Sequence, residues 1–326
     1  MVRSGVRVTA HARLHFGQID LCGELGRRFG SIGVAVQVPR VVVVATPSGR
    51  LEVEGASADR VRWAADRFFQ VVGRRPAGRV EVLEEIPSHV GLGSGTQLML
   101  AVGLALATLH QIAVSTGDLA RMMQRGGRSG VGIGTFAHGG FVVDGGVRGN
   151  AGETSIPPVV FHHALPTDWW FVIAVPRHGS GLSGSDEDAA FATAPPMSPH
   201  DVGRICWHLV MQMLPAVVEH DIGQFGAALT AIQRIVGDYF AAIQGGRFST
   251  TLGAHLVDRM LAAGAYGAGQ SSWGPAVYGL VKGESAAVAL AAALKAAVPA
   301  DATVDITCTT AVNSGARCDQ VDLGPP

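Results

Sequence analysis

One glycine-rich stretch, Pro87-Ser88-His89-Val90-Gly91-Leu92-Gly93-Ser94-Gly95-Thr96-Gln97, is well suited to bind an anion. Three glycines within five residues let the backbone turn tightly and approach a ligand. The apolar run Leu98–Leu109 follows directly and predicts a helix that Ser94 or Thr96 would cap. The unpaired N–H groups and the positive dipole end of this helix favour a phosphate or pyrophosphate. The predicted ligands are Gly91, Gly93, Ser94, Gly95 and Thr96.

Two further glycine-rich stretches, Gly126–Gly146 and Gly267–Pro275, add donors for such a ligand. Glycine at this density suits close backbone contact with a ligand better than a packed core. The candidate phosphate or substrate ligands in them are Arg128, Ser129, Gly130, Ser271 and Ser272. Asp144 follows a predicted strand and is a candidate metal or hydroxyl partner. For the stretch Pro87–Gln97, the alternative is a tight turn that only precedes a buried helix.

The passage from His11 to Gly30 is rich in side chains that do chemistry. We expect a short strand at Val6–Ala10 to deliver these side chains into a loop kept open by glycines. The candidate catalytic residues are Arg13, His15, Asp20 and Arg27, and Asp20 is also a candidate metal ligand. The alternative is that the arginines and carboxylates of this segment pair with one another at the surface.

The elements that position these residues predict an α+β protein of two domains, residues 1–155 and 156–326. Strands are expected at 41–46, which Leu51–Val53 could join, and at 79–83, 141–146, 169–175, 275–281 and 303–309. Helices are expected from 57, at 96–110, 117–124, 200–220, 221–244, 250–263 and 285–297. The glycine-rich stretch then lies between a strand and a helix, which is the context that anion binding requires.

Composition narrows the classes of protein. The chain has 326 residues, of which 48% are hydrophobic and 16% charged, so it folds into an ordered core. Its formal charge of -1 argues against nucleic acid as a partner, and no apolar run is long enough to span a bilayer. The four cysteines lack Cys-x-x-Cys spacing, which favours a reducing, cytoplasmic setting. The lysines are Lys282 and Lys295, so anions earlier in the chain must be met by arginines or backbone N–H groups.

The three glycine-rich stretches, taken in order, resemble the three motifs of the GHMP superfamily of small-molecule kinases. This resemblance implies an N-terminal domain like ribosomal protein S5 domain 2, a C-terminal ferredoxin-like domain and a site in the cleft between them. Many of these kinases carry an aspartate in a Ser-Gly-x-Asp word, whereas Ser129-Gly130-Val131 is followed here by Gly132. The group that activates the acceptor hydroxyl or holds magnesium in those kinases is therefore missing.

Four longer sequence segments resemble one branch of this superfamily, the β-ribofuranosylaminobenzene 5'-phosphate synthase family. They are Ala12–Leu21, Gly30–Ala35, Gly126–Gly146 and Gly269–Pro275, and the resemblance covers most of the chain. It implies a decarboxylating glycosyltransferase of tetrahydromethanopterin biosynthesis. The substrates would be 5-phosphoribosyl 1-pyrophosphate and 4-aminobenzoate, with 4-hydroxybenzoate or a related acceptor left open. The products would be a C-riboside, pyrophosphate and carbon dioxide, and the assembly would be a homodimer.

The candidate residues fit this chemistry. The helix start, Arg128, Ser129 and Mg²⁺ would neutralise the leaving pyrophosphate. Asp20 would stabilise the oxocarbenium-like centre or bind the metal, and Arg13 or Arg27 would orient the benzoate carboxylate. Two other functions stay open from the sequence. One is an ATP-dependent kinase of a small alcohol, and the other is a non-catalytic protein that binds a nucleotide or phosphate.

Overall fold

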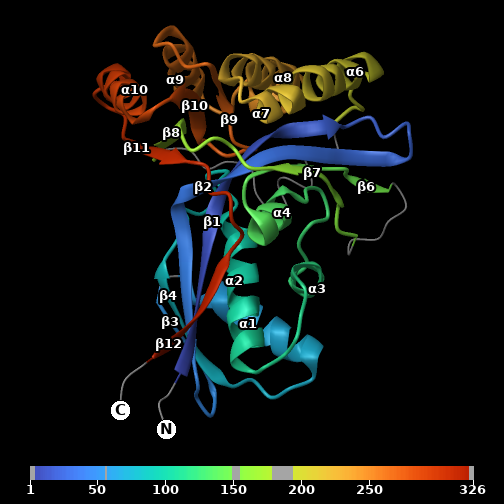
Figure 1. The fold of residues 1–326 in the computed structure, drawn as a ribbon, viewed down its shortest axis with the longest axis vertical. Helices are drawn as coiled ribbons and strands as arrows, with labels where there is room; N and C mark the ends of the chain where they lie inside the picture. The colour runs from blue at the N-terminus through green and yellow to red at the C-terminus, as the bar shows by residue number, and fades with distance from the viewer. Residues whose placement is uncertain (1–3, 56, 149–154, 178–193, 323–326) are drawn as a thin grey trace.

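Two long antiparallel strands, β1 (Ser4–Asp20) and β2 (Arg27–Thr46), run through the whole molecule. The computed structural model describes residues 4–55, 57–148, 155–177 and 194–322. The pairing of β1 with β2 shifts after His11 and again after His15, and there the strands bend beneath the upper helices (Figure 1). The predicted strand at Val6–Ala10 is therefore only the start of a longer one, and the candidate residues Arg13, His15 and Asp20 lie on β1 rather than in a loop.

The first sheet forms around β1 and β2 in the order β12-β1-β2-β4-β3, and β5 and β6 also pair with β2. Its other strands are β3 (Leu51–Glu54), β4 (Gly78–Glu84), β5 (Phe141–Asp144), β6 (Val147–Arg148), β7 (Val159–His163) and β12 (Arg317–Asp322). The expected partner of Leu51–Val53 was wrong, because β3 pairs with β4, in parallel. The sheet also takes in β7 and β12, from the segment 156–326 that we assigned to the second domain, so the sheets do not follow the expected boundary.

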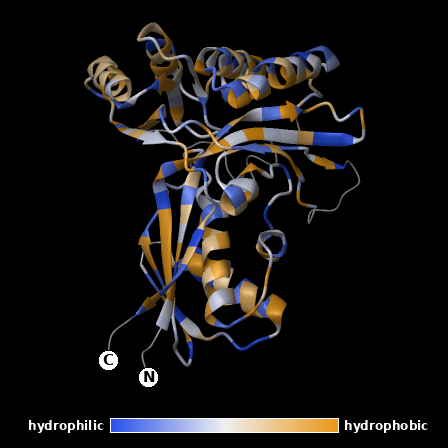
Figure 2. Cartoon of the chain, viewed as in Figure 1, coloured by the Kyte–Doolittle hydropathy of each residue, from blue (hydrophilic) through white to orange (hydrophobic). Residues whose placement is uncertain are grey.

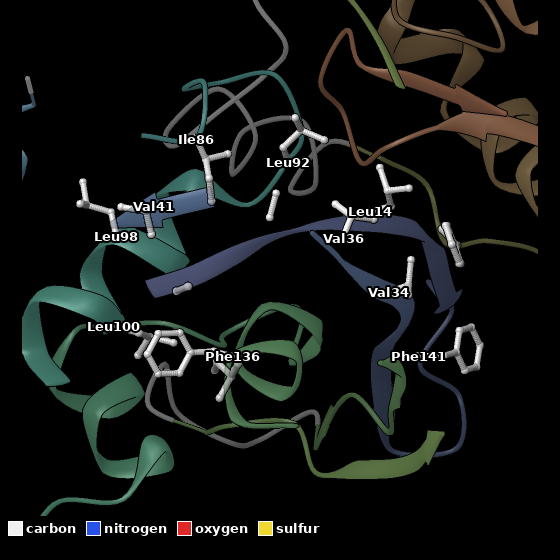
Figure 3. Close-up of a cluster of buried hydrophobic side chains, with 14 of the residues drawn as sticks. Leu14, Val34, Val36, Val41, Ile86, Leu92, Leu98, Leu100, Phe136 and Phe141 are labelled. Carbon is white, nitrogen blue, oxygen red and sulfur yellow. The ribbon is translucent and has the colours of Figure 1, made fainter. Parts of the chain in front are cut away.

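Helices pack on one side of this sheet and build the lower core. They are α1 (Ala58–Val72), α2 (Ser94–Leu109), α3 (Thr116–Met122) and α4 (Val131–His138). Helix α2 is coloured hydrophobic along most of its length in Figure 2, and it packs against β1, β2 and α1. Figure 3 shows Leu98 and Leu100 of α2 near Val41 of β2 and Phe136 of α4 in this core. The central position of α2 fixes the direction of its N-terminus.

The second sheet is antiparallel, in the order β11-β8-β10-β9. Its strands are β8 (Trp169–Pro176), β9 (Gly267–Gln270), β10 (Val277–Lys282) and β11 (Val304–Thr310). Val172 and Ala174 face a core with α9 (Thr251–Ala262) and α10 (Glu284–Ala297), whereas Phe171 and Ile173 join the core shared with β1. The remaining helical segments are α6 (Pro199–His208), the π-helical η1 (Leu209–Met213), α7 (Leu214–Glu219) and α8 (Ile222–Gln244). The expected α+β class is confirmed.

Candidate active site

The glycine-rich loop ends at the N-terminus of α2, as the sequence predicts. The expected cap is wrong, because the N-cap is Gly93 (φ 82°), and no side chain of the described residues caps the helix. A Cβ atom at Gly93 would lie 3.1 Å from Cγ of Arg13, whose side chain crosses the loop at this point. The first N–H groups of α2 therefore have no side-chain acceptor, which is the arrangement that binds anions in other helices.

The third glycine-rich stretch closes over this loop and joins the two sheets. The Gly91 carbonyl accepts hydrogen bonds from Nη1 of Arg13 and, at 2.7 Å, from Oγ of Ser271. Oγ of Ser271 also accepts the N–H of His15 at 3.0 Å, and the N–H of Ser272 donates to the His15 carbonyl at 3.3 Å. A Cβ atom at Gly91 would lie only 2.0 Å from the Ser271 carbonyl oxygen. Glycine is therefore required where these loops touch.

Two arginines that the sequence analysis did not select flank the N-terminus of α2. A Cβ atom at Gly95 would lie 3.6 Å from Nη2 of Arg60 and 3.7 Å from Nη1 of Arg125. Arg60, in the first turn of α1, donates to Oγ of Ser88 at 2.6 Å. The Arg125 side chain makes no hydrogen bond or ion pair within the described part of the chain, and its Nε is buried. Burial, followed by the charge of Arg60, lowers the pKa of Arg125.

The two neighbouring guanidinium groups of Arg60 and Arg125 suit an anion as a ligand. Two like charges held close together in a half-buried place repel each other, which costs stability unless an opposite charge lies beside them. A phosphate or pyrophosphate at the start of α2 would supply the missing charge and accept from both guanidinium groups. The scarcity of lysine pointed toward arginine ligands, but neither Arg60 nor Arg125 lies in a glycine-rich word that would have singled it out.

His15 and Ser129 meet at the edge of this site. The N–H of Gly17 donates to Nδ1 of His15 at 3.3 Å, so the neutral ring carries its proton on Nε2 and donates to Oγ of Ser129, also at 3.3 Å. Burial, followed by the charge of Arg13, lowers the pKa of His15 to about 3. The ring is therefore neutral near pH 7, and its contacts suit positioning of Ser129 better than proton transfer.

The second glycine-rich stretch is held by Asp144, which is fully buried. One of its carboxylate oxygens accepts from the N–H of Gly130 at 2.8 Å, and the other accepts from the N–H of Gly146 at 2.9 Å. Burial raises the pKa of Asp144 to about 6. These contacts suit a structural role for Asp144, because the buried carboxylate joins the two ends of this stretch, and its predicted role as a metal ligand gains no support from them.

Gly132, where the resemblance to GHMP kinases leads us to expect an aspartate, lies against the start of α2. A Cβ atom there would lie 3.2 Å from Cγ2 of Thr96, and the Gly132 carbonyl accepts from Nε2 of Gln97 at 2.8 Å. The position therefore borders the predicted phosphate site, and the chain places no side chain at it.

Arg128, a predicted phosphate ligand, lies in the loop before α4 and is half-buried.

Asp20 and Arg27 lie at the tip of the β1–β2 hairpin, away from the glycine-rich loop. Asp20 follows Arg13 by seven residues of strand, a span of about 20 Å. One oxygen of Asp20 accepts the N–H groups of Cys22 and Gly23, at 2.7 and 2.8 Å. Arg27 donates to the carbonyls of Gly145 and Gly146, both at 2.8 Å. The structure therefore does not bring these two residues to the N-terminus of α2.

A cavity of about 760 Å³ opens between the glycine-rich loop and the second sheet. The loop contributes residues Pro87 to Val90 and Leu92, and the bend of β2 contributes Val38 and Pro39. The opposite wall consists of Ile173, Val175, Pro176, Arg177, Asp305 and Thr307. Its size and mostly apolar lining are those of a small-molecule site, and its position between two domains is a common place for one. The family resemblance implied a site in a cleft between two domains, but the lining residues were not among the candidate site residues, because the walls come from segments far apart in the chain.

Comparison with known proteins agrees with this geometry. The model of the GHMP kinases N terminal domain matches residues 59–140, and that of the GHMP kinases C terminal domain matches residues 213–300. A β-ribofuranosylphenol 5'-phosphate synthase from Methanothermobacter thermautotrophicus is 35% identical over 83% of this chain and 87% of the relative. The chain belongs to this family. A family member of the same name from Archaeoglobus fulgidus is 37% identical over 71% of this chain and 76% of its own. The expected family is thereby confirmed, although the relatives' names specify a phenol rather than an aminobenzene.

Solved structures confirm the expected fold of this family member. Homoserine kinase from Cytophaga hutchinsonii superposes with a TM-score of 0.70 and 18% identity, covering 97% of each chain. Mevalonate diphosphate decarboxylase from Staphylococcus aureus gives a TM-score of 0.67 at 14% identity, covering 98% of each chain. At these identities the likeness concerns the fold alone. Within the described residues, no helix has the length and apolar character needed to cross a membrane.

Proposed function

We propose that the protein transfers a phosphoribosyl group from 5-phosphoribosyl 1-pyrophosphate to a 4-substituted benzoate, releasing pyrophosphate and carbon dioxide. The observation that carries the proposal is the uncapped N-terminus of α2 beside Arg60 and Arg125, a cationic place built without a carboxylate partner among the described residues. Membership of the β-ribofuranosylphenol 5'-phosphate synthase family supports the same reaction type.

The donor's pyrophosphate fits the start of α2. Pyrophosphate leaves readily only when its developing charge is neutralised, and preorganised donors in a partly dry site are effective at this. The N–H groups after Gly93 and the guanidinium groups of Arg60 and Arg125 would supply that neutralisation. The C1–O bond then breaks and leaves an oxocarbenium-like ribosyl centre.

The acceptor attacks that centre through the ring carbon that bears its carboxylate. A new C–C bond forms, the bond to the carboxylate breaks, and its electron pair restores the aromatic ring as carbon dioxide leaves. A 4-amino or 4-hydroxyl group promotes this attack, because it donates electron density to the carbon opposite it. The sequence resemblance favours 4-aminobenzoate, whereas the phenol in the relatives' names corresponds to 4-hydroxybenzoate. In the pathway predicted from the resemblance, tetrahydromethanopterin biosynthesis, this would be a riboside-forming step.

In this proposal, Mg²⁺ binds only together with the phosphates of 5-phosphoribosyl 1-pyrophosphate. Among the described residues, no group of three histidines, cysteines or carboxylates could hold a metal. Asp144 is fully buried and accepts from two backbone N–H groups, and Asp20 lies at the tip of the β1–β2 hairpin, away from the start of α2. The residues that the structure describes therefore do not form a resident Mg²⁺ site, and we assign no step to the metal. Mg²⁺ commonly binds through substrate phosphates with few protein ligands, so a dependence on it would reflect the donor.

The second candidate function is an ATP-dependent kinase of a small alcohol. The anion site and the fold shared with homoserine kinase favour it. Gly132 opposes it, because the described site has no carboxylate beside Thr96 to activate an acceptor hydroxyl.

Release of labelled carbon dioxide distinguishes the two. The protein is incubated with 5-phosphoribosyl 1-pyrophosphate, Mg²⁺ and either carboxyl-labelled 4-aminobenzoate or 4-hydroxybenzoate, beside an ATP-consumption assay on a panel of small alcohols. Carbon dioxide and pyrophosphate released in equal amounts, and only when both substrates are present, would establish the synthase. ATP turnover on an alcohol without carbon dioxide release would contradict it.

A further inference from the structure

The cavity between the glycine-rich loop and the second sheet has apolar walls and a carboxylate, Asp305, which together suit a 4-substituted benzoate. Its middle is apolar, with Val38 and Pro39 from β2 and Ile173 and Val175 from β8. Such walls suit a flat ring that lacks charge. Ser88 of the loop wall accepts a hydrogen bond from Arg60, so this cavity and the anion site are adjacent.

The wall formed by the second sheet carries one carboxylate, Asp305, held by one guanidinium group. Nε and Nη2 of Arg177 donate to the two Asp305 oxygens at 2.8 to 3.1 Å. This hydrogen bonding by Arg177 lowers the pKa of Asp305. An ionised carboxylate only accepts hydrogen bonds, and two oxygens leave acceptor positions beyond those that Arg177 uses.

The reaction fixes which way an acceptor faces. The ring carbon that bears the carboxylate must meet the ribosyl centre, whose pyrophosphate lies at the start of α2 on the glycine-loop side. The 4-substituent, at the opposite end of the ring, then faces the wall that carries Asp305. Both 4-amino and 4-hydroxyl groups can donate a hydrogen bond there, and a 4-methoxy group cannot.

Resting on the proposed function, we propose that this cavity is the acceptor pocket and that Asp305 determines specificity by accepting a hydrogen bond from the 4-amino or 4-hydroxyl group. Arg177 is a positioning residue that holds the carboxylate in place. About half of the Asp305 side chain is exposed to solvent, so water partly replaces a missing donor, and an analogue that lacks the donor is rejected only modestly.

The test compares 4-hydroxybenzoate with 4-methoxybenzoate in the wild-type protein, Asp305→Asn and Asp305→Leu. We expect the wild type to prefer the hydroxyl compound about two- to tenfold in kcat/KM and Asp305→Leu to lose most of that preference. The KM for 5-phosphoribosyl 1-pyrophosphate should stay unchanged, which a merely structural role would not predict. Asp319→Asn is the matched control, because Asp319 is a carboxylate paired with Arg317 on β12, outside the cavity.

Failure of this inference can be told apart from failure of the proposed function. If the wild type turns over benzoates but Asp305→Leu keeps the full preference, the pocket assignment is wrong and the reaction stands. If no benzoate is turned over, ligand-observed NMR of 4-hydroxybenzoate binding decides. Binding that the wild type shows and Asp305→Leu loses would support the pocket, and equal binding or none would overturn it.

Discussion

Replacing Arg125 with glutamine should separate binding from stability. A hydrogen bond to a charged group contributes about 1.5–3 kcal/mol, which corresponds to a factor of about 10 to 150 in affinity. The inhibition constant for pyrophosphate and the KM for 5-phosphoribosyl 1-pyrophosphate should rise within that range. The acceptor KM should change little, because the acceptor cavity does not include Arg125.

The thermal stability of Arg125→Gln without ligand should rise or stay the same, although its affinity for pyrophosphate falls. In the empty protein, Arg125 is partly buried beside Arg60, and no carboxylate contributes to its pKa shift. Removing this charge relieves desolvation and repulsion, so the thermal midpoint without ligand should equal or exceed that of the wild type. Arg121→Gln is the control, because Arg121 is exposed on α3 and pairs with Asp118. A variant that melts several degrees lower, or that binds pyrophosphate as well as the wild type, would refute the anion site.

Three further predictions concern the loops and the buried titratable groups. Gly91→Ala should lower the free energy of unfolding by more than about 2 kcal/mol, because the added Cβ would collide with the Ser271 carbonyl oxygen. The control is Gly26→Ala, because Gly26 also has a positive φ but nothing lies within 4 Å of its added Cβ. That variant should lose only about 1 kcal/mol, and thermal unfolding measures both changes. The raised pKa of Asp144 means that ionisation weakens the fold as pH rises from about 4 to about 6, so the melting difference between Asp144→Asn and the wild type should change in that window and level off above it. His15 should remain neutral with its proton on Nε2 from pH 5 to 8 in ¹⁵N NMR, and titration near pH 6.5 would contradict its burial.

The sequence predicted the parts of the site that depend on local chemistry. The glycine-rich loop precedes a helix because its glycines can adopt positive φ, at Gly91 and Gly93, and because Leu98–Leu109 can only be buried. The helices at 221–244 and 285–297 were also confirmed within a residue of their bounds, since long apolar periodicity leaves little choice.

The parts that depend on long-range pairing could not be predicted in the same way. The passage from His11 to Gly30 reads as a loop because it combines polar side chains with several glycines, yet pairing with residues 29–40 keeps it a strand as far as Asp20. That extension carries Asp20 about 20 Å from Arg13 and separates residues that were expected to act together. Arg60 lies in the first turn of α1 and Arg125 in the loop after α3, and only the packing of these helices against α2 makes the two arginines neighbours.

The arginine pair and Gly132 both favour an anion at the start of α2. A carboxylate at position 132 would lie beside Thr96 at the start of α2, where it would repel a pyrophosphate unless a metal ion stood between them. With glycine there, the repulsion is absent, and the guanidinium groups of Arg60 and Arg125 provide positive charge that the protein itself holds. In the proposed reaction, such a site would lack a group to activate an attacking hydroxyl but would stabilise a leaving pyrophosphate. That combination suits an aromatic carbon nucleophile, which needs no base before it attacks.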